Sequence, residues 1–538
     1  MASEKSPSRT WSMRACAHPV AVERLARLYI GRPDNEFNWT SIATGLAIGL
    51  AVSALIFARS ILASDGYLSP DSMNYLALAQ NLNLGHGFMV QNEGYSPAGP
   101  AYFAIWPVGY PLAIHLLSQT TGLSVFVASK LLGALVVTCC TSMVAVAGGR
   151  LGGVLALSFA FAANLAIFSF TWSEVTFDFF LVSAAVLLAG IIGRPEKHLV
   201  VRSLLLAACC IGMFLSRYVG AFAVSFLGIS ALAAMWRRDL PAVVINAILC
   251  LAVIGFMWLY LRHNADVTGY ATGMPRVPPL DSAGHRLAMM VRALAGSMIL
   301  PVVVVDFDFQ NLGPHLLDRL AVIVAVAQLI GITWLAKFIL GRYRQPAREI
   351  RVDSLTLSLF LAGALYLSAI ITLRWFSEFD PYDFRLLGPG LLLVEIAILR
   401  MALVSWPRAA GGITVFAAAI AASSMAFAAV PLAARAEPGY RTIVKSVERR
   451  YSEVPRGAIV VFGDEHMRYL RPDLFITEPM CRPWYDETDR WPAFLDEIDR
   501  SHPVFVDMNG HALELHGCDS SVRAALAGRH AGELFRLP

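Results

Sequence analysis

Charged residues are scarce in this chain: only 15% of its 538 residues are charged, while 57% are hydrophobic. Soluble globular proteins average about 25% charged residues, so a chain of this composition cannot cover its surface in water. This shortage excludes an ordinary soluble protein. The long apolar runs that accompany it predict a protein of the lipid bilayer with several spanning segments.

The chain also lacks the marks of several other protein classes. Its eight cysteines show no C-x-x-C spacing of a metal site, and no contiguous basic patch with aromatic platforms suggests a nucleic-acid partner. Neither a nucleotide-binding glycine loop nor the internal repeat of inverted-repeat transporters is visible. A long polar stretch precedes the first apolar run and no small-residue cleavage site follows it, so a cleavable signal peptide is not predicted.

The apolar runs predict about eleven spanning helices, since a crossing needs about 20 apolar residues. The run 203–235 is interrupted at Arg217, and the charge pattern favours two short helices that meet there. The predicted spans are 41–63, 123–147, 151–170, 173–193, 203–217, 218–235, 241–261, 317–340, 353–373, 386–404 and 410–433.

The short clusters of Lys and Arg predict the orientation, because such clusters gather in cytoplasmic loops. With these spans every cluster falls on the same side as the basic tail 1–40, which is therefore expected to be cytoplasmic. The external regions are then the loops 64–122 and 262–316 and the tail 434–538. This arrangement predicts a multi-pass membrane protein, with the membrane domain at 41–433.

The tail is expected to be a small α/β domain. Residues 441–451 have helical spacing, and 458–462 and 503–507 are typical of buried strands. The predicted fold class is thus an all-α polytopic membrane domain followed by a small soluble α/β domain. Cys481 and Cys518 lie in this tail, where they either form a disulfide or stay unpaired and buried.

Several motifs follow one another along the membrane region. The first external loop contains Asp71, Ser72, Tyr75 and Ala79 on a helix predicted to begin at Pro70 and to end near Leu84. The remaining motifs are Gly85-x-Gly87, the P-x-G-Y-P of 107–111, Thr171-Trp172-Ser173-Glu174, the R-Y-x-G of 217–220 and the D-x-R-x-L-x-P of 383–389.

This ordered set resembles the GT-C glycosyltransferases, integral membrane enzymes that take a sugar from a polyprenyl-phosphate donor. Within them it is similar to the bacterial dolichyl-phosphate-mannose-transferase-like subset, which includes the aminoarabinose transferase of lipid A. The resemblance implies an inverting transfer of a hexosyl or pentosyl group on the outer face of a bacterial plasma (inner) membrane. The acceptor is a lipid, a glycan or a protein, and dependence on a divalent cation stays open.

The resemblance also implies roles for particular residues. Asp71 is the expected catalytic base, Glu174 a second catalytic acid, and Arg217 and Arg385 the ligands of the donor phosphate, since guanidinium matches phosphate geometry. No metal ligands are predicted. One departure from the family is that Asp65 lies before the Ser-Pro turn and is not a clear match for its second acid. The expected substrate-binding residues are Asp65, Tyr75, Tyr110, Tyr218 and Asp383.

Each of these residues also has a structural explanation. Asp71 could be a first-turn acid favoured by the helix dipole, and Thr171 with Glu174 could form a capping box. Arg217 and Arg385 could extend to water at span ends, and the tyrosines could be interfacial aromatics.

The alternative functions are a secondary transporter or flippase for a polyprenyl-linked or amphipathic substrate, and a scaffold without catalysis. A transporter would place polar residues near mid-span. In this sequence acids and arginines gather at outer span ends and in external loops, which favours the enzyme.

Overall fold

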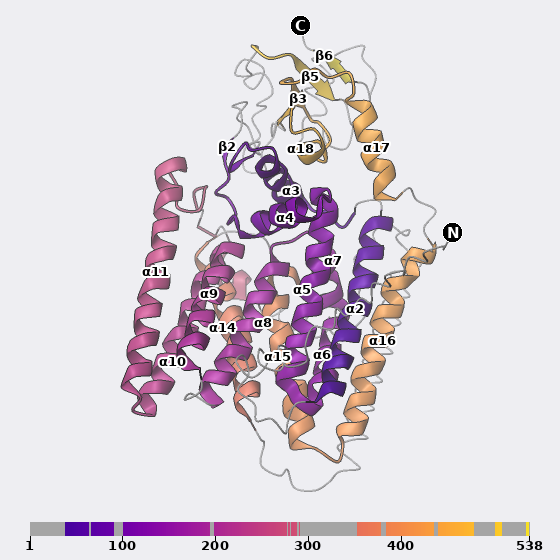
Figure 1. Cartoon of the computed structure of the whole chain (residues 1–538). Helices are drawn as coiled ribbons and strands as arrows, with labels where there is room; N and C mark the ends of the chain where they lie inside the picture. The colour runs from indigo at the N-terminus through magenta and orange to yellow at the C-terminus, as the bar shows by residue number, and fades with distance from the viewer. Residues whose placement is uncertain are drawn as a thin grey trace, which may run out of the picture.

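A long helical bundle carries a smaller domain at one end (Figure 1). Outside the described residues lie Asp65, Asp383, Cys481, Cys518 and the predicted span 317–340. A computed structural model describes residues 38–63, 66–90, 101–193, 198–276, 278–279, 281–287, 290, 352–377, 384–434, 439–477, 501–507 and 534–536.

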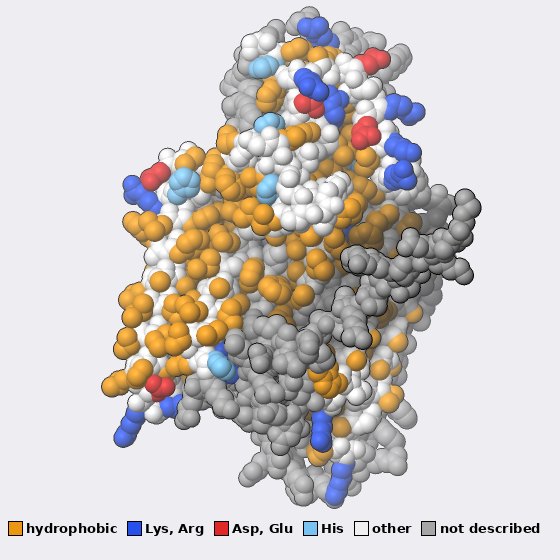
Figure 2. All heavy atoms as spheres, viewed as in Figure 1, with side chains coloured by type: hydrophobic (Ala, Val, Ile, Leu, Met, Phe, Trp, Pro, Cys, Tyr) orange, Lys and Arg blue, Asp and Glu red, His pale blue; other side chains and the backbone are white. Residues whose placement is uncertain are grey.

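Apolar helices form the bundle, as the sequence predicts. Among the described residues eight helical runs are long and apolar enough to cross a membrane. Their outer faces form a broad hydrophobic surface, with charged side chains near its two ends (Figure 2). The main helices of these eight runs are α2 (Trp39–Leu62), α5 (Val125–Gly148), α8 (Glu174–Gly193), α9 (Leu199–Ser216), α10 (Val224–Trp236), α11 (Leu240–Thr268), α14 (Ser354–Phe376) and α15 (Phe384–Ser405). A further apolar helix, α16 (Ala410–Ala434), packs against α2.

The predicted span at 151–170 is not one continuous helix, because this segment forms a series of short helices. The backbone is extended at Phe161, where the helical run stops. The short helices nevertheless run the length of α2, since Gly153 N donates to Ser41 Oγ near one end of that helix and the Ser169 carbonyl accepts from Ser60 Oγ near the other. The segment therefore passes from one end of the bundle to the other, mostly buried among its neighbours. The short helices are η2 (Gly149–Leu151), α6 (Gly152–Ala156), η3 (Leu157–Ala160) and α7 (Ala162–Ser169).

The break predicted at Arg217 is confirmed. Helix α9 ends at Ser216, Arg217 has an extended backbone, and η4 (Tyr218–Ala223) then leads into α10. Gly220 explains how the two halves pack, since a Cβ at this position would lie 2.3 Å from the Met213 carbonyl carbon. Only glycine allows so close an approach of two backbones.

Two helices lie across one end of the bundle, beneath the C-terminal domain (Figure 1). Helix α3 (Pro70–Asn83) starts at the predicted residue, and α4 (Gly109–Thr121) follows a two-stranded antiparallel sheet of β1 (Met89–Val90) and β2 (Ala101–Tyr102). Helix α3 has buried residues around its whole circumference. It is therefore held between the bundle and the C-terminal domain.

The C-terminal domain is the predicted α/β unit. Its sheet has the strand order β4-β3-β5-β6, in which β3 pairs in parallel with both neighbours and β6 is antiparallel to β5. Helix α18 packs against α3 of the membrane domain. The elements are α17 (Tyr440–Arg450), β3 (Ile459–Val461), α18 (Met467–Leu470), β4 (Phe475–Thr477), β5 (Val504–Asp507) and β6 (Leu534–Arg536).

Candidate active site

The segment that leads into α3 is fixed by side chains of the bundle. Gly66 and Tyr67 both have positive φ angles, 60° and 51°. The Tyr67 hydroxyl accepts a hydrogen bond from Arg59 Nε at 2.9 Å, and the Tyr67 carbonyl accepts one from Lys130 Nζ at 3.1 Å. Lys130 also donates to the Ser169 carbonyl at 3.0 Å. Two buried cations thus hold the turn that sets the start of α3.

Helix α3 then begins with a capping box. Ser69 and Ser72 exchange side-chain and backbone hydrogen bonds, with Pro70 in the first turn. Ser72 Oγ also donates to the Thr171 carbonyl at 2.8 Å. This contact attaches the first turn of α3 to the segment before α8. Asp71 is therefore presented from a turn fixed on both sides.

Glu174 is the first residue of α8, and its side chain is fully buried. The capping-box explanation of Glu174 is wrong, because Thr171 lies too far before the helix to cap it. The Thr171 hydroxyl instead makes a hydrogen bond with Ser129 Oγ at 3.0 Å. Glu174 Oε2 accepts a hydrogen bond from Ser173 at 3.3 Å, so its burial needs another reason.

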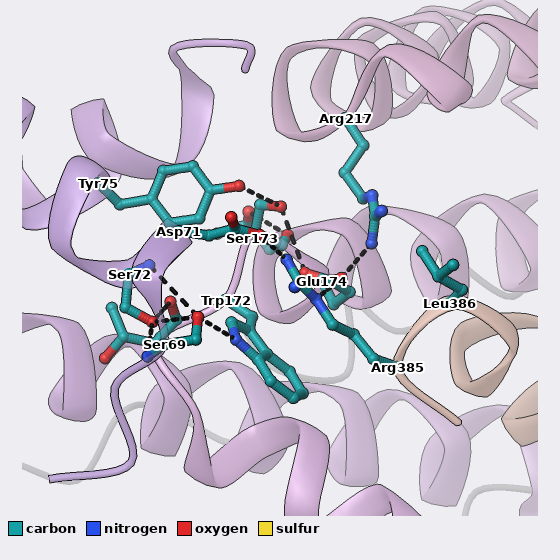
Figure 3. A network of polar contacts seen from close by, with 12 residues as sticks. Ser69, Asp71, Ser72, Tyr75, Trp172, Ser173, Glu174, Arg217, Arg385 and Leu386 are labelled. Carbon is teal, nitrogen blue, oxygen red and sulfur yellow. Dashed lines mark hydrogen bonds and ion pairs between the residues drawn. The ribbon is translucent and has the colours of Figure 1, made fainter. Parts of the chain in front are cut away.

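That reason is a cluster of charges from four separate segments (Figure 3). Arg385 Nε donates to Glu174 Oε1 at 2.7 Å, and Arg385 Nη2 pairs with Asp71 Oδ2. Arg217 Nη1 pairs with the same Glu174 oxygen. The Arg385 guanidinium also lies 4.7 Å from the ring centre of Trp172, which adds a cation–π contact.

The cluster is balanced in charge and almost closed to water. Two carboxylates face two guanidinium groups, and the Glu174 side chain is 0% exposed. The Asp71 side chain is 24% exposed, so Asp71 is the acid that a solute can reach. Arg217 and Arg385 point inward to acids, which rules out the interpretation that they simply extend to water.

Tyr75 joins the cluster through its hydroxyl, which donates to Ser173 Oγ at 3.2 Å (Figure 3). Burial, followed by the nearby charge of Asp71, raises the pKa of the Tyr75 phenol above its usual value. The phenol therefore stays neutral and remains a hydrogen-bond donor. Tyr110 packs edge-on against Tyr75, with ring centres 5.3 Å apart, and is also fully buried. Both rings belong to the core behind the site.

Of the other predicted substrate-binding residues, the structure describes only Tyr218. Tyr218 follows Arg217, but its hydroxyl donates to the Ala104 carbonyl at 2.6 Å and accepts from Asn264 at 2.9 Å, away from the charge cluster. Asp65 and Asp383 are outside the described residues. The structure thus brings together four of the charged residues named from the sequence and places Tyr218 beside the segment that follows β2.

Sequence reasoning missed two members of the site. Trp172 supports Arg385, and its indole Nε1 donates to Ser69 Oγ at 2.8 Å. Ser173 connects Tyr75 to Glu174. Both stand in the Thr171–Glu174 motif, so the signal was present in the sequence. Their partners lie about a hundred residues away in the chain, and no local pattern reveals such contacts.

A divalent cation does not fit the acids that the structure places here. Asp71 and Glu174 are both engaged by guanidinium groups. Among the described residues no group of three His, Cys, Asp or Glu side chains could hold a metal ion.

No protein-family model matches the chain, and a search of curated proteins found no match. Among solved structures the chain is similar to ArnT from Cupriavidus metallidurans in the apo state, with a TM-score of 0.46 and 13% identity over 91% of this chain and 96% of that one. The same protein bound to undecaprenyl phosphate gives a TM-score of 0.47 and 12% identity over 92% and 97%.

A third similar structure is the archaeal oligosaccharyltransferase AglB from Archaeoglobus fulgidus, in complex with an inhibitory peptide and a dolichol-phosphate. Its TM-score is 0.45, with 12% identity over 93% of this chain and 75% of that one. At such low identity the chemistry of the present site has to follow from its own residues.

Proposed function

We propose that this multi-pass membrane protein is an inverting glycosyltransferase that moves a sugar from a polyprenyl-phosphate donor to an acceptor hydroxyl on the extracytoplasmic face. The observation that carries the proposal is the cluster in which Asp71 meets Arg385, while Arg385 and Arg217 share Glu174. It combines a partly exposed carboxylate with two guanidinium groups at one end of the bundle. In-line displacement of a phosphate from the anomeric carbon needs a base for the attacking hydroxyl and cations for the departing phosphate.

In the proposed reaction Asp71 accepts the proton of the acceptor hydroxyl. The acceptor oxygen forms a bond to the anomeric carbon while the bond from that carbon to the phosphate oxygen breaks. The polyprenyl phosphate leaves with the bonding electrons, and Arg217 and Arg385 stabilise its negative charge. A guanidinium has about five N–H donors, so each arginine has donors beyond those it gives to the acids.

Glu174 has a different role in this proposal. It is fully buried and accepts from both arginines through one oxygen. A carboxylate in that position holds the two cations at a fixed spacing and lowers their mutual repulsion. We therefore assign Glu174 to positioning the phosphate ligands and Asp71 to proton transfer.

The proposal is tested with the purified full chain in lipid nanodiscs. Undecaprenyl-phosphate hexoses and pentoses are the donors, a membrane glycolipid extract supplies acceptors, and released undecaprenyl phosphate is measured. Asp71→Asn should lower release by about 10²–10⁴-fold, the usual contribution of a general base. Asp239→Asn is the matched control, because Asp239 caps α11 and Asn keeps that cap.

Equal release by wild type and Asp71→Asn would remove Asp71 from the role of base. Failure of the wild type to bind any polyprenyl-phosphate sugar in a competition assay would reject the transferase itself.

One observation favours a transporter as the second candidate. Glu395 lies inside α15, and its carboxylate is held by Asn164 Nδ2 at 3.4 Å. Acids within membrane helices often mark substrate or proton paths. Transport of a labelled polyprenyl-linked sugar across proteoliposomes, without release of the phosphate, would favour this reading.

A further inference from the structure

A cavity of about 510 Å³ adjoins α3, the helix that carries Asp71. It is bounded by the turn that carries Asn74, by the β1–β2 region and the segment after it, and by the C-terminal end of α11. Binding sites for small organic molecules have volumes of about 300–1,000 Å³. The space is therefore large enough for a ligand, and the proposed phosphate chemistry does not use it.

The residues around this cavity indicate the kind of ligand. Its lining includes the aromatic residues Tyr102, Phe103 and Trp106 together with the polar residues Asn74 and Thr268. None of the described residues that line it carries a charge. Aromatic faces pack against the C–H groups of a pyranose ring, and amide and hydroxyl groups meet its hydroxyls. This combination suits an uncharged sugar better than a phosphate, a carboxylate or a bare lipid chain.

Two pairs of consecutive residues connect the cavity to the charge cluster. On α3, Asn74 lines the cavity while Tyr75 reaches Ser173 of the cluster. After α9, Arg217 pairs with Glu174 while Tyr218 donates to the carbonyl of Ala104, a lining residue. Asp71 also lies one turn before Asn74 on the same helix face. The cavity therefore lies one helical turn from the proposed base, where α3 meets β2 and the segment after it.

The C-terminal domain contributes to one wall of this cavity. Arg468 of α18 is buried, and its Nη1 donates to Asn74 Oδ1 at 3.0 Å. This bond fixes which way the Asn74 amide faces. The soluble domain thereby orients a polar group in the lining, although it supplies no member of the charge cluster.

We infer that this cavity binds an uncharged sugar ring of the acceptor and places one of its hydroxyls at Asp71, so that the acceptor is a glycan. The inference rests on the proposed function for its account of the acceptor. Asp71 is one helical turn from Asn74 of the lining and pairs with Arg385, which would hold the donor phosphate. A hydroxyl of a sugar bound in the cavity is thus placed to attack the anomeric carbon of the donor.

The first experiment measures binding without turnover. Methyl hexosides and neutral disaccharides are added to the full chain in nanodiscs, and saturation-transfer difference NMR gives their affinity. Val267→Trp fills the cavity from a site that is half exposed. It should weaken binding by at least about tenfold, because the ring loses its space. Val244→Trp is the matched control, since Val244 is an exposed residue of the same helix that does not line the cavity.

A second variant, Tyr102→Ala, removes one aromatic wall and should also weaken binding. Absence of neutral-sugar binding in the wild type would overturn the inference. It would also be overturned if the Val267→Trp and Val244→Trp variants bound the neutral sugar with equal affinity. These results are independent of catalysis. They can therefore be told apart from failure of the proposed function, which would appear as no release of polyprenyl phosphate.

The turnover assay then identifies the source of the sugar. Val267→Trp should raise the apparent KM for the glycan acceptor by about tenfold and leave the apparent KM for the donor nearly unchanged. The opposite pattern would mean that the cavity holds the sugar of the donor, and it would overturn the assignment to the acceptor.

Discussion

Arg385 in the membrane domain and Arg471 in the C-terminal domain both pair with acids, but the two sets of contacts are built differently. In the membrane domain Arg385 joins Asp71 and Glu174, which lie 314 and 211 residues away in the chain. In the C-terminal domain Arg471 pairs with Asp473, two residues further on, through two hydrogen bonds of 2.9 Å. The first set gathers distant segments, whereas the second closes one local turn.

The remaining contacts of these arginines show what each set does. Arg471 also donates to the carbonyls of Tyr451 and Val454, so its guanidinium mainly holds backbone together. Arg385 contacts carboxylates and the Trp172 ring. A cation that satisfies backbone carbonyls is explained by folding alone. A buried cluster of side-chain charges contributes little to stability by itself and is more often retained for function.

Glu174→Gln gives the largest effect expected from this comparison. The change leaves two guanidinium groups without their shared carboxylate, and breaking such a buried set costs about 3–5 kcal/mol of unfolding free energy. Thermal unfolding in detergent measures the loss, and turnover should fall with it because the arginines separate. Glu395→Gln is the matched control, since Glu395 is buried beside an amide and not an arginine. Loss of turnover by Glu174→Gln at unchanged stability would instead support a directly catalytic Glu174.

Arg471→Met tests the other half of the comparison. It removes the bonds to Asp473 and to two carbonyls, and a loss of about 2 kcal/mol is expected for hydrogen bonds of a charged group. Hydrogen exchange should show the loss in residues 439–477, while turnover at saturating substrate changes by less than about threefold. If turnover fell as far as in Glu174→Gln, the contrast between the two regions would be lost.

The start of the site could be predicted from local sequence. Ser69 and Pro70 mark the beginning of α3, and the structure starts the helix there. The break at Arg217 also followed from the interrupted apolar run and the charge pattern. These features depend on neighbouring residues, which a sequence displays directly.

The assembly of the site could not be predicted in the same way. The pairing of Asp71 with Arg385 joins the start of α3 to the start of α15, and composition does not reveal it. Similarly, the apolar segment 151–170 runs from one end of the bundle to the other, yet it does so as a series of short buried helices. Hydrophobicity indicates removal from water, but it does not distinguish lipid from protein as the surroundings.

The smallest expected effect is a pH dependence in the C-terminal domain. The hydrogen bonds from Arg471 lower the pKa of the Asp473 carboxyl below its usual value, so folding favours the ionised form. The stabilisation is complete above the unfolded pKa of about 4 and is lost as the pH falls through the lower folded pKa. The difference in melting temperature between wild type and Asp473→Asn should therefore narrow below about pH 4. The pair is partly exposed, so the difference is modest at any pH. A constant difference from pH 7 down to pH 3 would show that Asp473 contributes through its shape and hydrogen bonds, and that its charge is not what holds this turn.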